Sequence, residues 1–109
     1  MLYIVIYYRL KQLEKEVKRL DDLIYMGRVL KHLRNAKGMS QEQMSLQCDI
    51  NLSYYSKIER GIGNPSMKKL FTILSALDVT PEEYWYRVAL EKHRFIRLPA
   101  GKYILASEE

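Results

Sequence analysis

Two short helices joined by a tight turn constrain the fold of this chain more than any other feature. Ser40 and Gln43 form a capping box, in which each side chain binds the backbone amide of the other residue and starts a helix. Residues 49–51, Asp-Ile-Asn, favour a turn because Asp and Asn tolerate turn geometry and cap backbone donors. A second helix over 52–60 then ends at Gly61.

Apolar residues at helical spacing predict three further helices around this pair. The first covers residues 23–37, with Asp22 as its N-cap. Another begins after Ser66, and the last begins at a capping box on Thr80 and runs to about His93. The sequence therefore predicts an all-α bundle of five helices, in which the second and third have the proportions of a helix-turn-helix motif.

A pattern of single residues extends through this bundle, over about residues 24–86. Its members are Gly27, Leu30, Leu33, Arg34, Gly38, Ser40-Gln41, Met44, Ile50, Tyr55, Ile58-Glu59-Arg60-Gly61, Asn64-Pro65-Ser66, Leu70, Leu77 and Val79. The pattern resembles that of the lambda-repressor-like, Cro/XRE-type helix-turn-helix transcriptional regulators. Ser45, Asp49 and Leu74 depart from it, since the family usually has Ala, Gly and Ala there. The angle between the two motif helices is therefore less constrained than the motif itself.

The resemblance implies that helix 52–60 reads the DNA major groove. Tyr55 and Ile58 share the inward face of that helix, so we expect base contacts from Leu52, Ser53, Tyr54 and Lys57. We expect phosphate contacts from Ser40, Gln41, Ser56, Arg60, Asn64, Lys68 and Lys69. The alternative for Leu52, Tyr54 and the lysines is an ordinary exposed side chain. The resemblance also implies a structural salt bridge between Arg34 and Glu59.

Charge and composition favour a nucleic-acid partner over an enzymatic role. Of the net charge of +5, +4 falls in residues 23–80, which hold eight basic and four acidic side chains. His32 and His93 stand alone, Cys48 is the single cysteine, and no glycine-rich phosphate loop occurs. We therefore expect no catalysis, cofactor or metal site. The apolar opening is too short to span a bilayer, so we expect a cytoplasmic protein.

The N-terminal extension, residues 1–22, supports two different predictions. Its apolar residues step by three and four, which is the seam of a coiled coil if the segment is helical. The dimerisation candidates on this seam are Tyr3, Ile6, Leu10, Leu13 and Val17. Residues 2–8, however, consist almost entirely of strand formers. We favour a strand there, followed by a helix over 9–20.

The C-terminal extension, residues 94–109, contains two short apolar runs around Pro99-Ala100-Gly101, which predicts a β-hairpin. Together with residues 2–8 it would form one small sheet, within a chain or across two chains. The helix-turn-helix domain, residues 23–93, is thus flanked by two extensions. We expect these extensions to build a homodimer, with packing onto their own bundle as the alternative.

The function that these patterns favour is sequence-specific binding of double-stranded DNA by a homodimeric repressor from a bacterium or phage. One alternative is a DNA-binding antitoxin, whose terminal segment would bind a toxin as its protein partner. Another is a protein-interaction adaptor that has kept the fold without DNA binding, for which the apolar Leu46 and Leu52 on outward positions argue.

Overall fold

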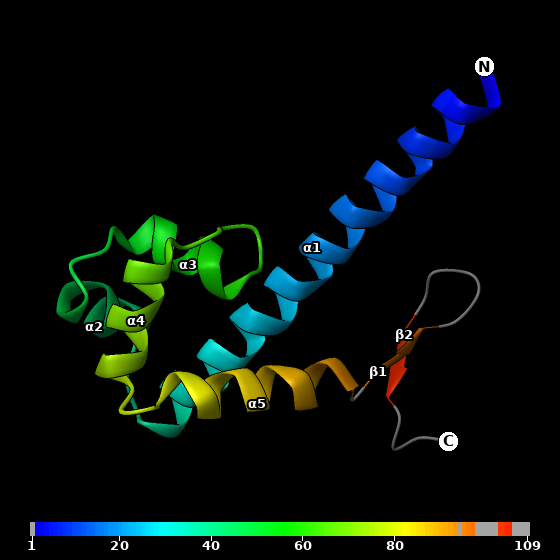
Figure 1. The fold of residues 1–109 in the computed structure, drawn as a ribbon. Coiled ribbons are helices and arrows are strands. Elements are labelled where there is room, and N and C mark those ends of the chain that lie inside the picture. Colours follow the sequence, from blue (N-terminus) through cyan, green and yellow to red (C-terminus); the bar gives the residue numbers. More distant parts are fainter. Residues whose placement is uncertain (1, 94, 98–102, 106–109) are drawn as a thin grey trace.

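The structure, a computed structural model, describes residues 2–93, 95–97 and 103–105, with side chains described for 2–12 and 22–93. In chain order its elements are α1 (Leu2–Ala36), α2 (Gln41–Gln47), α3 (Leu52–Glu59), α4 (Met67–Ala76), α5 (Pro81–His93), β1 (Phe95–Arg97) and β2 (Tyr103–Leu105). Helices α2 to α5 gather at the C-terminal part of α1, whose first turns project away from them (Figure 1). The predicted helical bundle with its helix-turn-helix motif is confirmed.

Helix α1 is continuous from Leu2 to Ala36. The sequence predicted three separate elements there, a strand over 2–8 and helices over 9–20 and 23–37. The predicted strand over 2–8 is wrong, and so is the helix start at Asp22. Strand formers favour a strand only where a neighbouring strand packs against them, whereas no glycine or proline interrupts the chain between residues 2 and 26. Asp22 lies inside the helix, and its carboxylate is 2.8 Å from the Lys92 Nζ on α5.

The sheet of three strands predicted across both extensions is also wrong, because its first member is helical. Among the described residues, β1 pairs antiparallel with β2, with Phe95 opposite Leu105 and Arg97 opposite Tyr103. This pair follows directly on α5 (Figure 1).

The core of the bundle receives side chains from all five helices. The largest fully buried ones are Tyr55, Tyr84, Leu30, Met44, Leu70, Ile73 and Leu74. Leu74, which departs from the family pattern, is 1% exposed, so the core accommodates the larger side chain. The Tyr84 hydroxyl donates to the carbonyl of Met26 at 3.1 Å and attaches α5 to α1.

Two glycines allow α1 to approach the end of α3 closely. A Cβ atom on Gly27 would lie 2.5 Å from the carbonyl oxygens of both Ile58 and Glu59. On Gly61, which has a φ of +79°, it would lie 2.6 Å from the Cα of Ile24. A side chain at either position would push backbone atoms apart. The position of α3 on α1 is therefore fixed by direct contact between backbones.

Candidate nucleic-acid interface

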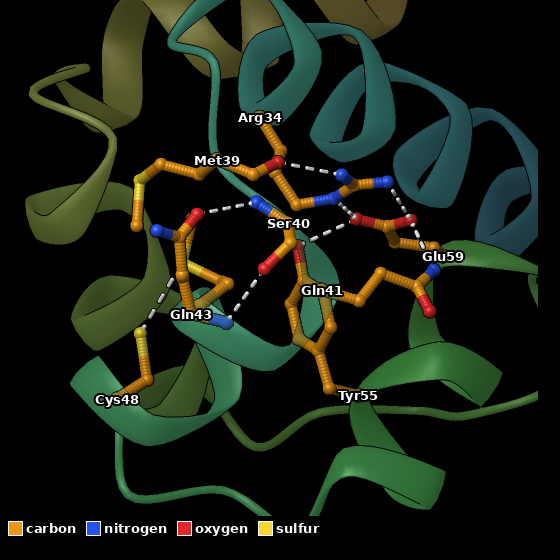
Figure 2. A network of polar contacts seen from close by, with 9 residues as sticks. Arg34, Met39, Ser40, Gln41, Gln43, Cys48, Tyr55 and Glu59 are labelled. Carbon is orange, nitrogen blue, oxygen red and sulfur yellow. Dashed lines mark hydrogen bonds and ion pairs between the residues drawn. The ribbon is translucent and has the colours of Figure 1, made fainter.

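The local geometry of α2 and α3 follows from the caps that the sequence predicts. The Ser40 Oγ accepts from the Gln43 amide at 3.0 Å, and the Ser40 amide donates to Gln43 Oε1 at 2.8 Å (Figure 2). Asp49 takes the left-handed conformation with a φ of +52° and turns the chain. Asn51 Oδ1 then accepts from the Tyr54 amide at 3.2 Å and starts α3. Both predicted caps are confirmed.

A buried carboxylate, that of Glu59, joins α1, α2 and α3. Arg34 donates to it through Nε at 2.6 Å and through Nη2 at 3.0 Å. The Tyr55 hydroxyl donates at 2.7 Å and the Gln41 Nε2 at 2.8 Å, so four hydrogen bonds converge on two oxygens (Figure 2). Arg34 also donates through Nη1 to the carbonyl of Met39 at 2.8 Å. This network ties the two motif helices to α1.

The electrostatics of the network keep this carboxylate ionised despite its burial. Burial alone would raise the pKa of Glu59, but the hydrogen bonds from Arg34, Tyr55 and Gln41 and the Arg34 charge outweigh it and hold the pKa below its usual range. The hydrogen bond to Glu59 in turn raises the pKa of Arg34. Burial raises the pKa of Tyr55, so its hydroxyl stays protonated and donates.

An open depression lies between the starts of α2 and α3 on the outer surface. It measures about 800 Å³ and is lined by Arg34, Ser40, Gln41, Glu42, Asn51, Leu52, Ser53 and Ser56. Five of these residues were predicted to contact DNA, namely Ser40, Gln41, Leu52, Ser53 and Ser56. The structure therefore brings predicted contact residues from the starts of both motif helices together around one depression. Glu42 and Asn51 were not predicted there. The sequence could have indicated them only through their positions, since Glu42 follows Gln41 and Asn51 is the N-cap of α3.

The remaining cationic residues of the predicted interface lie outside this depression. Lys57 and Arg60 are exposed along α3 and its C-cap, one turn and two turns beyond the start of that helix. Lys68 and Lys69 are exposed at the start of α4. Lys69 Nζ donates to the Asp49 carbonyl at 3.4 Å, which places this lysine beside the turn between α2 and α3.

Tyr54 makes a contact that sequence reasoning missed. Its side chain is partly buried against the core, and its hydroxyl donates to the carbonyl of Asn64 at 2.9 Å. The bond holds the loop between α3 and α4 and places the exposed Asn64 there. Because the hydroxyl hydrogen is used, a DNA contact by Tyr54 would involve its oxygen lone pairs or its ring edge. No local sequence pattern links the two residues.

Other kinds of site are not found in the described part of the chain. Within it, no group of His, Cys, Asp and Glu side chains could hold a metal ion. None of its helices combines the length and apolar character needed to cross a membrane. Cys48 is buried, and burial raises the pKa of its thiol.

Comparison with known proteins shows which family this chain resembles in sequence. The helix-turn-helix family model matches residues 30–84. The control protein C.BamHI of Bacillus amyloliquefaciens is 36% identical over 61 residues, which are 55% of this chain and 75% of that protein. The control protein C.MunI of a Mycoplasma species is 38% identical over 72 residues, covering 65% of this chain and 97% of that protein.

The fold is also similar to that of a controller protein whose structure has been solved. The restriction-modification controller protein C.Esp1396I, crystallised as a tetramer in complex with its natural 35 base-pair operator, aligns with a TM-score of 0.60. It is 30% identical, and the alignment covers 64% of this chain and 92% of that one. The fold and the paired motif helices thus define a helix-turn-helix regulator, a class of DNA-binding proteins that are not enzymes. The chain belongs to the helix-turn-helix family, in its Cro/XRE-type branch of transcriptional regulators.

Proposed function

We propose that the chain binds a specific sequence in double-stranded DNA as a homodimer and represses transcription. The observation that carries this proposal is the outer face of α3, where Leu52, Ser53 and Lys57 are exposed and two of them line the depression beside α2. A lysine suits guanine O6 or N7, a serine hydroxyl pairs with several bases, and a leucine suits a thymine methyl group. Helix α3 would lie in the major groove.

Phosphate contacts would fix the position of α3 in the groove. The candidates around it are Ser40, Gln41, Ser56, Arg60, Asn64, Lys68 and Lys69. Gln41 supports this role because its amide nitrogen carries two hydrogens, and the bond to Glu59 uses one of them. Tyr54 supports it indirectly, since its bond to the Asn64 carbonyl positions the loop. Contacts of this kind orient a protein on DNA without reading sequence.

A homodimer is proposed because one motif makes few base contacts and specific binding needs a larger interface. A two-fold dimer would read two half-sites about one helical turn apart, roughly 34 Å. The tetrameric state of C.Esp1396I on its operator supports an oligomer here. As a regulator of bacterial or phage genes it would act in the cytoplasm. The matches to control proteins favour neither the antitoxin nor the adaptor.

Selection from random duplex DNA at near-physiological salt tests the proposal directly. We expect the retained sequences to form an inverted repeat with half-sites about one turn apart. A single unrepeated half-site would keep the specific DNA binding and exclude the symmetric dimer. Absence of any enriched sequence would refute sequence-specific binding.

Lys57→Ala tests the assignment of a base-reading residue. We expect affinity for the selected site to fall by about 1–3 kcal/mol, with a smaller loss on random DNA. Arg87→Ala is the matched control, because it removes the same charge from α5, away from the depression. Titrations of both variants on selected and random duplexes measure the difference. An equal loss on both duplexes would make Lys57 a backbone contact only.

A further inference from the structure

The first turns of α1 expose apolar side chains that no described part of the chain covers. Leu2, Tyr3, Ile4, Val5, Ile6, Tyr7 and Tyr8 are all exposed, with Tyr3 at 87% and Ile6 at 49%. They lie on the part of α1 that projects from the bundle (Figure 1). The radius of gyration, 16.6 Å, exceeds the value of about 13 Å expected for a compact domain of this length. An apolar surface this prominent marks an interaction site.

The projecting helix carries a heptad seam. Tyr3, Ile6 and Leu10 follow one another at spacings of three and four, and the sequence continues the same spacing through Leu13, Val17, Leu20 and Ile24. Leu10 is 58% exposed and Ile24, where α1 enters the bundle, is 37% exposed. The side chains of residues 13–21 lie outside the described ones. The continuous helix places all seven positions on one stripe.

We propose that the projecting part of α1 pairs with the same helix of a second copy in an antiparallel coiled coil. In this arrangement Tyr3 packs opposite Leu20 of the second copy, Ile6 opposite Val17, and Leu10 opposite Leu13. The proposal specifies the interface of the homodimer in the proposed function and rests on that dimer. The family model begins at residue 30, so this interface lies outside the part that the family shares.

Charges beside the seam favour the antiparallel direction. By heptad position, Arg9 then flanks the seam opposite Glu16 of the second copy, and this attractive pair forms twice. A parallel pair would also gain an attraction, between Arg9 and Glu14. It would, however, place Glu16 opposite Asp21 of the second copy, and like charges at these flanking positions of a coiled coil repel each other. The antiparallel register contains no such repulsion.

The antiparallel register also sets the distance between the two bundles. At 1.5 Å per residue the two copies of residue 23 are separated by about 34 Å along the coil. That distance is comparable with one turn of DNA.

Leu10→Asp tests whether the seam holds the dimer, with Gln12→Asp as the matched control. Leu10 lies in the central layer of the coil, whereas Gln12 lies on its outer side and is exposed. Light scattering should give twice the chain mass of 13.0 kDa for the parent and the control. For Leu10→Asp we expect the dissociation constant to rise by roughly a hundredfold, because two carboxylates would be buried without partners. A parent that is monomeric at high micromolar concentration, or an unchanged dimer in Leu10→Asp, would overturn the proposal.

Single-cysteine variants test the direction of pairing. Oxidising a mixture of Tyr3→Cys and Leu20→Cys proteins should give the mixed disulfide, because facing Cβ atoms lie close enough to be bridged. Oxidising Tyr3→Cys alone should give no dimer, whereas a parallel coil would cross-link it efficiently. Cys48 is buried with a raised thiol pKa, so it should not interfere. Self-cross-linking at position 3 would refute the antiparallel arrangement.

Two further measurements separate this proposal from its alternatives. Sedimentation of the parent with anionic phospholipid vesicles should leave the protein in solution as a dimer. Capture of a monomer by the vesicles would assign the apolar turns to a membrane surface and overturn the proposal. Binding of a single half-site by Leu10→Asp would show that DNA recognition does not depend on the coil. The proposal of specific DNA binding and the proposal of pairing through α1 can therefore fail independently.

Discussion

Replacing Glu59 by glutamine tests whether the buried network positions the motif helices. The side chain of Glu59 is 2% exposed and receives hydrogen bonds from Arg34, Tyr55 and Gln41. Glutamine has nearly the same shape but no charge, and its NH₂ group must face one of these donors. Arg34, whose side chain is 9% exposed, would be left without a counter-charge. Removing one partner of a buried ion pair lowers the free energy of unfolding by about 3–5 kcal/mol.

The same variant has a predicted pH dependence. The pKa of Glu59 is lowered in the folded state, so the native protein binds fewer protons at this group than the unfolded chain. Its contribution to stability is therefore complete above the unfolded pKa, about 4.3, and is lost as the pH falls through the folded pKa. The difference between the parent and Glu59→Gln should be constant near pH 7 and should narrow below about pH 5.

Urea unfolding followed by circular dichroism from pH 7 to pH 3 measures both effects. The control is Glu83→Gln on α5, because Glu83 pairs with Arg87 at 3.0 Å with both side chains about half exposed. An exposed pair of this spacing contributes about 0.3–0.5 kcal/mol. If Glu59→Gln destabilises the protein no more than Glu83→Gln, or by an amount independent of pH, the reasoning about the network is wrong.

Three smaller substitutions follow from other contacts. Gly27→Ala would force its Cβ to within 2.5 Å of α3 backbone oxygens, so urea unfolding should show a larger loss than for Gly38→Ala. A Cβ on Gly38 would meet no atom within 4 Å, so only the φ of +73° opposes alanine there. Holding a residue with a side chain in this left-handed conformation costs roughly 1–2 kcal/mol. Ser40→Ala removes the cap of α2, and thermal unfolding should show a loss of about 0.5–2 kcal/mol. Tyr54→Phe removes the bond to Asn64; DNA titration should show weaker binding, and unchanged affinity would make the bond irrelevant to recognition.

The helix-turn-helix region could be predicted from sequence because its signals are local. A cap such as Ser40 acts on an amide three residues away, and the turn at Asp49 needs only that residue to adopt a left-handed conformation. The resemblance to Cro/XRE-type regulators added the pairing of Arg34 with Glu59, which spacing alone does not reveal. These features do not depend on what the rest of the chain does.

The parts that sequence reasoning missed depend on distant contacts or on competition between structures. The bond of Gln41 to Glu59 spans 18 residues, and local periodicity carries no information about it. Residues 2–8 have side chains that suit a strand as well as a helix. The helix wins because each residue added to an existing helix contributes a hydrogen bond, and no strand lies against this segment in the described chain.

Because α1 is continuous, the length of its projecting part determines how the bundle is rotated around the helix axis relative to the proposed pairing surface. With no glycine or proline between residues 2 and 26, the helix offers no hinge between the proposed pairing surface and the bundle. Each residue added or deleted there would rotate the bundle by about 100° around the helix axis. Seven residues make almost two full turns, so deletion of a heptad would shift the bundle by about 10 Å and nearly restore its orientation. Relatives with such an extension should therefore vary in its length by whole heptads.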